Sequence, residues 1–222
     1  MSPEATLSRI LAGGVVAVVR GDDPGPLVEV ARALVAGGVC AIEITFTVPD
    51  ALDTIRAVRG ALGDEVVVGA GTVLDAETAR AALLVGAEFV VSPCLDRKVI
   101  RICRRYGKVV MPGAFTPTEV LAAWEAGADV VKIFPADVGG PGYLRSLRGP
   151  LPQIRLMPTS GVDLSTAPAY LSAGACCLGV GSALVDPKLV AAGDFGAIRE
   201  RAAAFAEVVR RARDAGKPGL LD

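Results

Sequence analysis

Short apolar runs alternate with helical stretches along the whole chain, and this alternation constrains the fold more than any other feature of the sequence. Eight runs are rich in β-branched residues and bounded by Gly or Pro; they span 14–20, 40–46, 65–71, 88–93, 108–113, 129–135, 153–158 and 176–181. Nearly continuous hydrophobicity is typical of parallel strands that are buried on both faces. The sequence therefore predicts an α/β protein with eight parallel strands.

The segments between these runs read as amphipathic helices that end in glycine. The junction recurs as "VAGGVCAIEI", "LVGAEFVVSP", "EAGADVVKIF" and "SAGACCLGVG", and glycine is the usual residue just past a helix C-terminus. Eight such units in 222 residues predict a single-domain (β/α)₈ TIM barrel over 1–222, with "KPGLLD" as a short tail. A doubly wound open sheet is the structural alternative, but the spacing is even and no GxGxxG follows the first strand.

Composition excludes several classes of chemistry. The chain has no histidine, a net charge of −1 and five cysteines without a CxxC pair. A Ser-His-Asp triad and a His-ligated metal are therefore impossible, so any acid–base chemistry must fall to Glu, Asp, Lys, Tyr or Cys. Balanced charge, no long apolar run and no signal-peptide pattern predict a cytoplasmic protein whose partners are neither nucleic acid nor membrane. The lack of Asn and the single Gln153 fit a heat-adapted protein or a GC-rich genome.

Two ionisable residues interrupt otherwise apolar strands: Glu43 in "CAIEITF" and Lys132 in "VVKIF". Side chains alternate between the two faces of a strand, so the neighbours of Glu43 and Lys132 are expected to point toward the helices. Glu43 and Lys132 themselves are expected to point into the barrel. A buried ammonium group is costly, so a lysine here is expected to be neutral and nucleophilic toward carbonyl carbons, with the carboxylate moving protons. The alternative is a structural Glu–Lys pair, although stability alone is a poor reason to keep one.

Small and polar residues follow other strands at the end of a barrel where active sites lie. "MPTSGV" and "GVGSAL" come after the last two strands and predict a phosphate cradle in which Gly161, Gly181 and Ser182 permit close backbone approach. Glycine-rich turns occur in any barrel, which is the simpler interpretation. Thr72 in "GAGTV" is a candidate hydroxyl donor or part of a plain turn. Arg20, which ends the first strand, is a candidate carboxylate ligand or a surface residue.

Taken together, these stretches resemble the family of 2-keto-3-deoxy-6-phosphogluconate (KDPG) and 4-hydroxy-2-oxoglutarate (KHG) aldolases. The resemblance covers nearly the whole chain; its motifs are "ALVAGGVCAIEITFTVPDAL", "VVGAGTVLD", "EFVVSPCLD", "MPGAFTPTEV", "VKIFPADVGGPGYLRSLRGPLP", "MPTSGV" and "GVGSALV". It implies a class I, metal-free aldolase that splits KDPG into pyruvate and glyceraldehyde 3-phosphate in the Entner–Doudoroff pathway. It also implies a homotrimer and a reaction that needs no cofactor.

The resemblance assigns a role to each candidate residue. The Schiff-base lysine falls on Lys132 and the acid–base glutamate on Glu43. Residues that line the substrate site fall on Thr72, Pro93, Phe134 and Thr159, and phosphate contacts fall on Ser160, Gly161, Gly181 and Ser182.

The chain departs from the family pattern at two positions. Thr47 stands where many members carry an arginine that binds the substrate carboxylate, and Arg20 on the adjacent strand is expected to replace it. Ser160 stands where the late loop often has glycine; a serine fits if its φ is negative, whereas a positive φ would strain the loop.

Other functions remain open at this stage. A galactonate-type aldolase and a 4-hydroxy-2-oxoglutarate aldolase would use the same residues. A metal-dependent aldolase conflicts with the lack of histidine. A phosphometabolite-binding barrel without catalysis would have little use for a buried amine.

Overall fold

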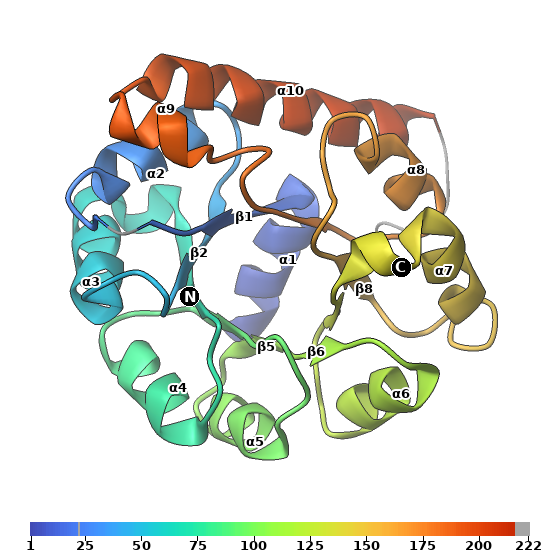
Figure 1. The fold of residues 1–222 in the computed structure, drawn as a ribbon. Helices are drawn as coiled ribbons and strands as arrows, with labels where there is room; N and C mark the ends of the chain where they lie inside the picture. The colour runs from blue at the N-terminus through green and yellow to red at the C-terminus, as the bar shows by residue number, and fades with distance from the viewer. Residues whose placement is uncertain (22, 216–222) are drawn as a thin grey trace.

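Parallel strands form a ring with helices outside it (Figure 1). The computed structural model describes residues 1–21 and 23–215, so the tail predicted at 217–222 lies outside the described residues. Each of the eight predicted runs contains a strand, and the fifth also includes the first residue of a second strand. The strands are β1 (Val15–Val19), β2 (Ala41–Thr45), β3 (Val67–Gly71), β4 (Phe89–Val91), β5 (Val109–Met111), β6 (Gly113–Ala114), β7 (Val131–Ile133), β8 (Leu156–Pro158) and β9 (Leu178–Val180).

The strands follow one another in chain order around the ring. One sheet runs β5-β4-β3-β2-β1-β9 and a second runs β6-β7-β8. Pro112 separates β5 from β6, because proline has no N–H to give to a ladder, but its carbonyl still accepts the backbone N–H of Lys132 at 2.9 Å. A bridge between Thr159 and Gly179 links β8 to β9 and closes the ring. The barrel prediction is therefore confirmed, and the doubly wound alternative is wrong.

Local sequence signals mark the start of α6 and the ends of α2, α4, α6 and α8. Thr116 and Glu119 form a capping box at the start of α6. The glycine in each of the four repeated junctions has a positive φ, which residues with a side chain rarely adopt; these are Gly38, Gly86, Gly127 and Gly174. The helices are α1 (Pro3–Gly13), α2 (Leu27–Ala36), α3 (Ala51–Leu62), α4 (Ala76–Leu84), α5 (Arg97–Arg105), α6 (Pro117–Glu125), α7 (Gly140–Arg148), α8 (Ala167–Ser172), α9 (Pro187–Ala191) and α10 (Phe195–Asp214), with 3₁₀ turns η1 (Gly63–Glu65) and η2 (Ala136–Val138).

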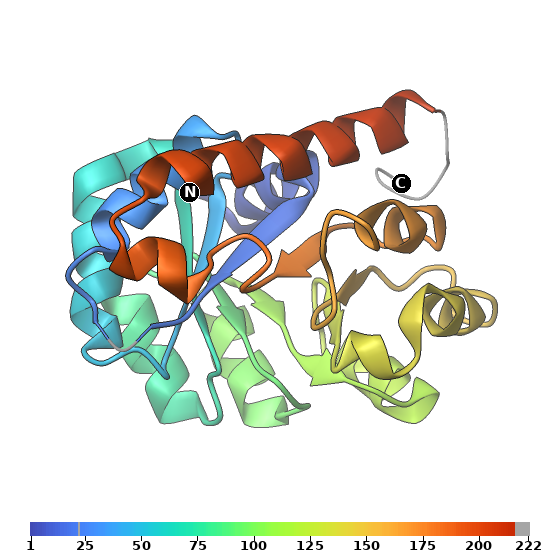
Figure 2. The same ribbon diagram turned by 45° about the horizontal axis from the view of Figure 1, so that its top comes forward.

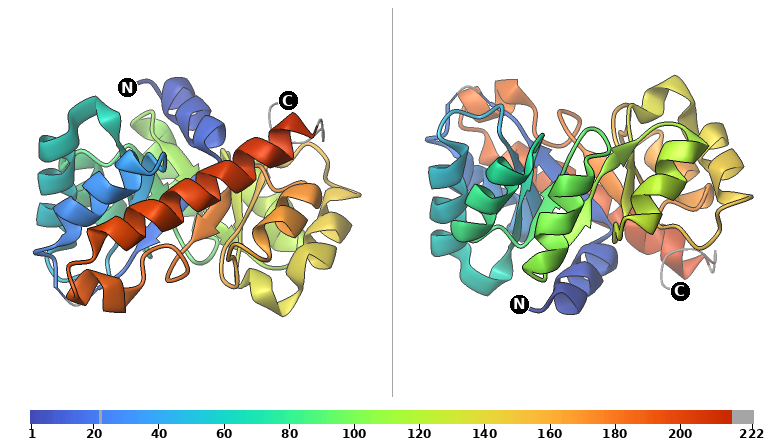
Figure 3. Two further views of the ribbon diagram at one scale, coloured as in Figure 1. Left: turned by 90° about the horizontal axis from the view of Figure 1, so that it is seen from above. Right: turned by 90° about the horizontal axis from the view of Figure 1, so that it is seen from below.

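The helix α1 covers one end of the barrel (Figure 3). Its residues Ile10 and Leu11 belong to the apolar cluster inside the ring, together with side chains from the first half of several strands. The N-terminal ends of the strands are therefore closed by apolar packing, which leaves the opposite ends for a site. The long helix α10 crosses the outside (Figure 2) and packs on α2 and α8. Its Arg213 donates to the carbonyls of Leu11 and Ala12 at the end of α1.

Among the described residues, no helix is both long and apolar enough to cross a membrane. The five cysteines are free thiols, and three of them are buried.

Candidate active site

Glu43 and Lys132 both point into the barrel. The residues next to them in their strands belong to the apolar layer between strands and helices. These neighbours are Ile42 and Ile44 for Glu43, and Val131 and Ile133 for Lys132. The alternation of side chains along a strand therefore sends the two ionisable groups inward, as predicted. Glu43 is 1% exposed and Lys132 is 3% exposed.

The carboxylate of Glu43 is buried without a hydrogen-bond partner. Neither of its oxygens is hydrogen-bonded to any described residue, so Glu43 and Lys132 do not form the hydrogen-bonded pair that a purely structural role would need. Burial raises the pKa of Glu43, and the positive charges of Lys132 and then Arg20 oppose this rise. A carboxyl group of this kind can exchange a proton at a pH where an exposed one stays ionised.

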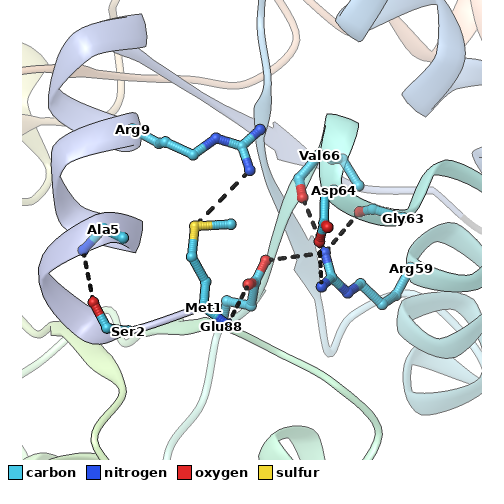
Figure 4. Close-up of polar contacts among 9 residues, drawn as sticks. All are labelled: Met1, Ser2, Ala5, Arg9, Arg59, Gly63, Asp64, Val66 and Glu88. Carbon is cyan, nitrogen blue, oxygen red and sulfur yellow. Dashed lines mark hydrogen bonds and ion pairs between the residues drawn. The ribbon is translucent and has the colours of Figure 1, made fainter.

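A second buried carboxylate shows the contrast. Glu88 directly precedes β4, at the N-terminal end of that strand, and Figure 4 shows it between Met1 and Arg59. Its Oε2 lies 3.5 Å from Nη1 of Arg59, and its Oε1 lies 3.9 Å from the amino group of Met1. Arg59 also donates to the carbonyl of Gly63 at 2.6 Å. One oxygen of Glu88 thus accepts a hydrogen bond from Arg59, and the other lies within ion-pair distance of Met1 although it has no hydrogen-bond partner. Among the described residues, Glu43 has neither kind of contact.

Gly71 makes room for the Glu43 side chain. A Cβ built on Gly71 would overlap the Oε1, Cδ and Cγ atoms of Glu43, so only glycine at this position allows the carboxylate to lie across β3. Gly71 is not among the site residues predicted from the sequence. A glycine at the end of an otherwise apolar strand is the signal that could have found it, because glycine in a strand often marks a close approach of another group.

Thr72 follows Gly71 and has a φ of +56°. A β-branched residue in this region is strained, and such strain is commonly found at functional sites. Pro93 lies after β4, where its carbonyl packs against Gly113, and Gly113 is in turn paired with Lys132. Both residues therefore lie at the C-terminal ends of their strands, as predicted.

A cavity of about 510 Å³ lies at the loops that follow β1, β7, β8 and β9. It is lined by seven of the predicted residues, namely Arg20, Phe134, Thr159, Ser160, Gly161, Gly181 and Ser182, and also by Val18, Val162, Asp163, Gly179 and Ala183. The lining does not include Glu43, Lys132, Thr72 or Pro93. Lys132 is linked to this cavity through Phe134, whose ring centre lies 5.1 Å from Nζ.

The late loop combines strain with an unpaired hydroxyl. Ser160 has a φ of +82° and Gly161 a φ of +66°. Of the two cases expected for Ser160, the positive φ is the one that occurs, and the loop is strained because a residue with a side chain disfavours such a φ. Thr159, 5% exposed, lies over Gly179, and its Oγ1 has no hydrogen-bond partner among the described residues. A buried, unpaired hydroxyl in a cavity wall is suited to a polar ligand.

The charge of Asp163 in the cavity wall is satisfied locally. Its Oδ1 accepts the backbone N–H groups of Ser165 and Thr166, each within 2.9 Å. Hydrogen bonds from Ser165 and Thr166 hold the pKa of Asp163 below its ordinary value. Among the described residues, no three His, Cys, Asp or Glu side chains are grouped to hold a metal ion.

Known proteins are similar to this chain in sequence and in fold. The family model described as KDPG and KHG aldolase matches residues 7–201. The chain is 38% identical over 190 residues to a 2-dehydro-3-deoxy-phosphogluconate aldolase of Treponema pallidum, covering 85% of this chain and 89% of the relative. It is 34% identical over 199 residues to a 2-dehydro-3-deoxy-6-phosphogalactonate aldolase of Escherichia coli K12, covering 89% and 95%.

A solved structure of a KDPG aldolase has a fold similar to that of this chain. A KDPG aldolase from Legionella pneumophila, with pyruvate captured at low pH as a covalent carbinolamine intermediate, matches with a TM-score of 0.84 and 26% identity, covering 90% of this chain and 97% of that one. The family model and the relatives match most of the chain, and the structure places a lysine and a glutamate inside the barrel. The protein is therefore a carbon–carbon lyase: it belongs to the KDPG and KHG aldolase family.

Proposed function

We propose that this class I aldolase cleaves KDPG into pyruvate and glyceraldehyde 3-phosphate, with Lys132 as the Schiff-base residue. The observation that carries the proposal is a 3%-exposed lysine within the barrel, near a buried carboxylate that has no hydrogen-bond partner among the described residues. An amine in this setting attacks a carbonyl carbon and needs a nearby group to move protons. The relatives named as KDPG aldolases support this substrate.

The reaction proceeds in balanced steps. The Nζ of Lys132 adds to C2 of the keto acid, and loss of water gives an iminium ion. Glu43, directly or through a water, accepts the proton of the C4 hydroxyl while the electrons of the C3–C4 bond move into the iminium. The aldehyde leaves, and the remaining enamine takes a proton at C3 from the Glu43 carboxyl. Water then hydrolyses the iminium, which releases pyruvate and regenerates the amine.

The cavity supplies the binding groups on either side of the reacting carbons. Arg20 is the arginine in its wall, and we assign it to the substrate carboxylate. The backbone around Ser160 and Gly161, with Gly181 and Ser182, is the proposed phosphate cradle, because consecutive backbone N–H groups in turns bind anions. Thr72, Pro93, Phe134 and Thr159 are the proposed contacts of the keto acid. Remote phosphate binding would orient the bond that breaks.

Borohydride trapping tests the mechanism. The protein is incubated with pyruvate and sodium borohydride, and the adduct is located by mass spectrometry in the unchanged chain, in Lys132→Ala and in Lys98→Ala, which removes an exposed lysine. We expect the adduct on Lys132 in the unchanged protein and in Lys98→Ala, and none in Lys132→Ala. A folded protein that forms no adduct would contradict the aldolase mechanism and favour a phosphometabolite-binding barrel.

Two other substrates belong to the same mechanism. The relative that acts on the phosphogalactonate compound makes that C4 epimer an alternative, and KHG, which lacks the phosphate, is another. Comparing kcat/KM for the three compounds decides among them. The proposed cradle favours a phosphorylated substrate, so KHG is expected to be the poorest of the three.

We also propose that the enzyme is a cytoplasmic homotrimer that acts in the Entner–Doudoroff pathway. The family resemblance supports the trimer and the pathway, and the phosphorylated substrate supports a cytoplasmic site. Adaptation to heat is proposed from composition, namely the lack of Asn and the single Gln. Light scattering in solution and a thermal melt test the trimer and the heat adaptation.

A further inference from the structure

Thr45, the last residue of β2, makes contacts that the proposed mechanism does not use. It is fully buried, and its Oγ1 donates to the carbonyl oxygen of Val19 at 3.0 Å. The same Oγ1 lies 2.7 Å from Oγ1 of Thr47. A threonine hydroxyl has one proton and the Val19 carbonyl only accepts, so Thr47 is the donor in the second contact. The two hydroxyls form a chain that runs from Thr47 through Thr45 to Val19.

This chain ends at the residue that precedes Arg20. Val19 is the last residue of β1, and its pairing with Ile44 is the last pair between β1 and β2. The Thr45 hydroxyl therefore adds a tie between the two strands beyond their final backbone pair. Without this hydrogen bond, only the backbone pairing between β1 and β2 would hold the end of β1 against β2.

Arg20 has no other anchor among the described residues. Its side chain is exposed, and it forms neither a hydrogen bond nor an ion pair with them. Its charge nevertheless acts on the Glu43 carboxyl, and its side chain lines the cavity of about 510 Å³. Since nothing holds the guanidinium itself, its direction depends on where the backbone of β1 ends.

We propose that Thr45, supported by Thr47, is a positioning residue that fixes the end of β1 and thereby aims Arg20 at the carboxylate of a 2-keto acid. Glu43 lies two residues before Thr45 on the same strand and faces the same side of it. The strand β2 thus carries both Glu43, the proton-transfer group, and Thr45, whose hydrogen bond to Val19 fixes where Arg20 begins. This inference rests on the proposed function, because it gives Arg20 the role of binding the substrate carboxylate.

Thr45→Val tests the inference, because valine keeps the shape of threonine and removes both hydrogen bonds. The readouts are KM and kcat for cleavage and the pyruvate concentration that half-saturates borohydride trapping. We expect KM and the half-saturating concentration each to rise about tenfold, because the loss of one hydrogen bond to a carbonyl has an effect of roughly this size. Thr45→Ser, which keeps the hydroxyl, is expected to restore both values.

A matched control and a milder variant accompany it. Thr54→Val removes a buried hydroxyl that donates to the carbonyl of Asp50 at 3.3 Å in α3, and it is expected to leave KM unchanged. Thr47→Val, at an exposed position, keeps the bond to Val19 and is expected to raise KM by about twofold to threefold. If Thr45→Val fails to fold, Thr47→Val still decides: an unchanged KM there overturns the inference.

A double-mutant cycle with Arg20→Ala separates positioning from simple packing. If Thr45 acts through Arg20, Thr45→Val will change KM by less than about twofold once Arg20 is alanine. An equal effect in both backgrounds overturns the inference while leaving the proposed function intact. If Arg20→Ala itself leaves KM and pyruvate trapping unchanged, the carboxylate role of Arg20 fails, and the positioning role fails with it.

Discussion

The carboxylate of Glu43 lies against the Cα of Gly71, so that any side chain at position 71 would overlap it. Glu43 and Gly71 come from the neighbouring strands β2 and β3, in which Thr45 pairs with Gly71. The proposed proton-transfer group is therefore positioned by the absence of a side chain on the next strand. Since neither oxygen of Glu43 is hydrogen-bonded to the described residues, steric fit is the main constraint on where this carboxylate lies.

Gly71→Ala should displace the Glu43 carboxylate and lower kcat by on the order of 100-fold, because a shift of about 1 Å in a reacting group has an effect of this size. The control is Gly60→Ala in α3, where a Cβ meets nothing within 4 Å; it should leave kcat unchanged. Steady-state kinetics of both variants check the prediction, and equal kcat values would contradict the steric role of Gly71.

Glu43→Gln should lower kcat for cleavage by about 10²–10⁴-fold, the usual contribution of a general acid–base group. Lys132 remains in this variant, so the borohydride adduct with pyruvate should still form. The two measurements together separate proton transfer from amine attack. Loss of the adduct along with cleavage would mean that Glu43 is needed for the attack itself.

The same substitution should make the protein more stable at neutral pH. Burial raises the pKa of Glu43 above its ordinary value of 4.5, so the folded protein binds this proton more tightly than the unfolded chain does. The free energy of unfolding therefore falls as pH rises from 4.5 through the raised pKa, and the loss persists above it. When urea unfolding is measured between a pH below 4.5 and neutral pH, the free energy of unfolding should fall less in Glu43→Gln than in the unchanged protein. An unchanged pH profile would show that Glu43 is not the cause.

Ser160→Gly should stabilise the fold by on the order of 1 kcal/mol, because a serine with positive φ is strained and a glycine is not, although glycine loses more backbone entropy on folding. The φ of Ser160 is +82°. Gly161→Ala is the opposite case: it adds a Cβ at a φ of +66° against Asp137 and should destabilise the fold. Denaturant unfolding measures both. A less stable Ser160→Gly would indicate that the hydroxyl makes a favourable contact.

Incubation with EDTA should leave cleavage unchanged. The chain has no histidine, and its described residues include no group of three or more Cys, Asp or Glu placed for a metal ion. In the proposed mechanism the iminium on Lys132 takes the electrons that a metal-bound carbonyl would take in a metal-dependent aldolase. Activity that EDTA removes and a divalent cation restores would rule out the metal-free mechanism.

The sequence by itself determined the barrel and the direction of its two ionisable side chains. Alternating apolar runs and helices ending in glycine predicted the strands, and the two-residue period along each strand predicted that Glu43 and Lys132 point inward. These are local properties, since a backbone of known type decides which face each side chain occupies. The polar residues at strand ends could be located for the same reason.

Only the tertiary structure decided how those side chains meet. It shows that Glu43 lies over Gly71 rather than in a hydrogen-bonded pair with Lys132, and that Ser160 has a positive φ. It also shows that the Thr45 hydroxyl reaches Val19. Each of these depends on the register between strands and on how the last loop meets its neighbours. Such distances are set by the packing of the whole ring, and no short stretch of sequence encodes them.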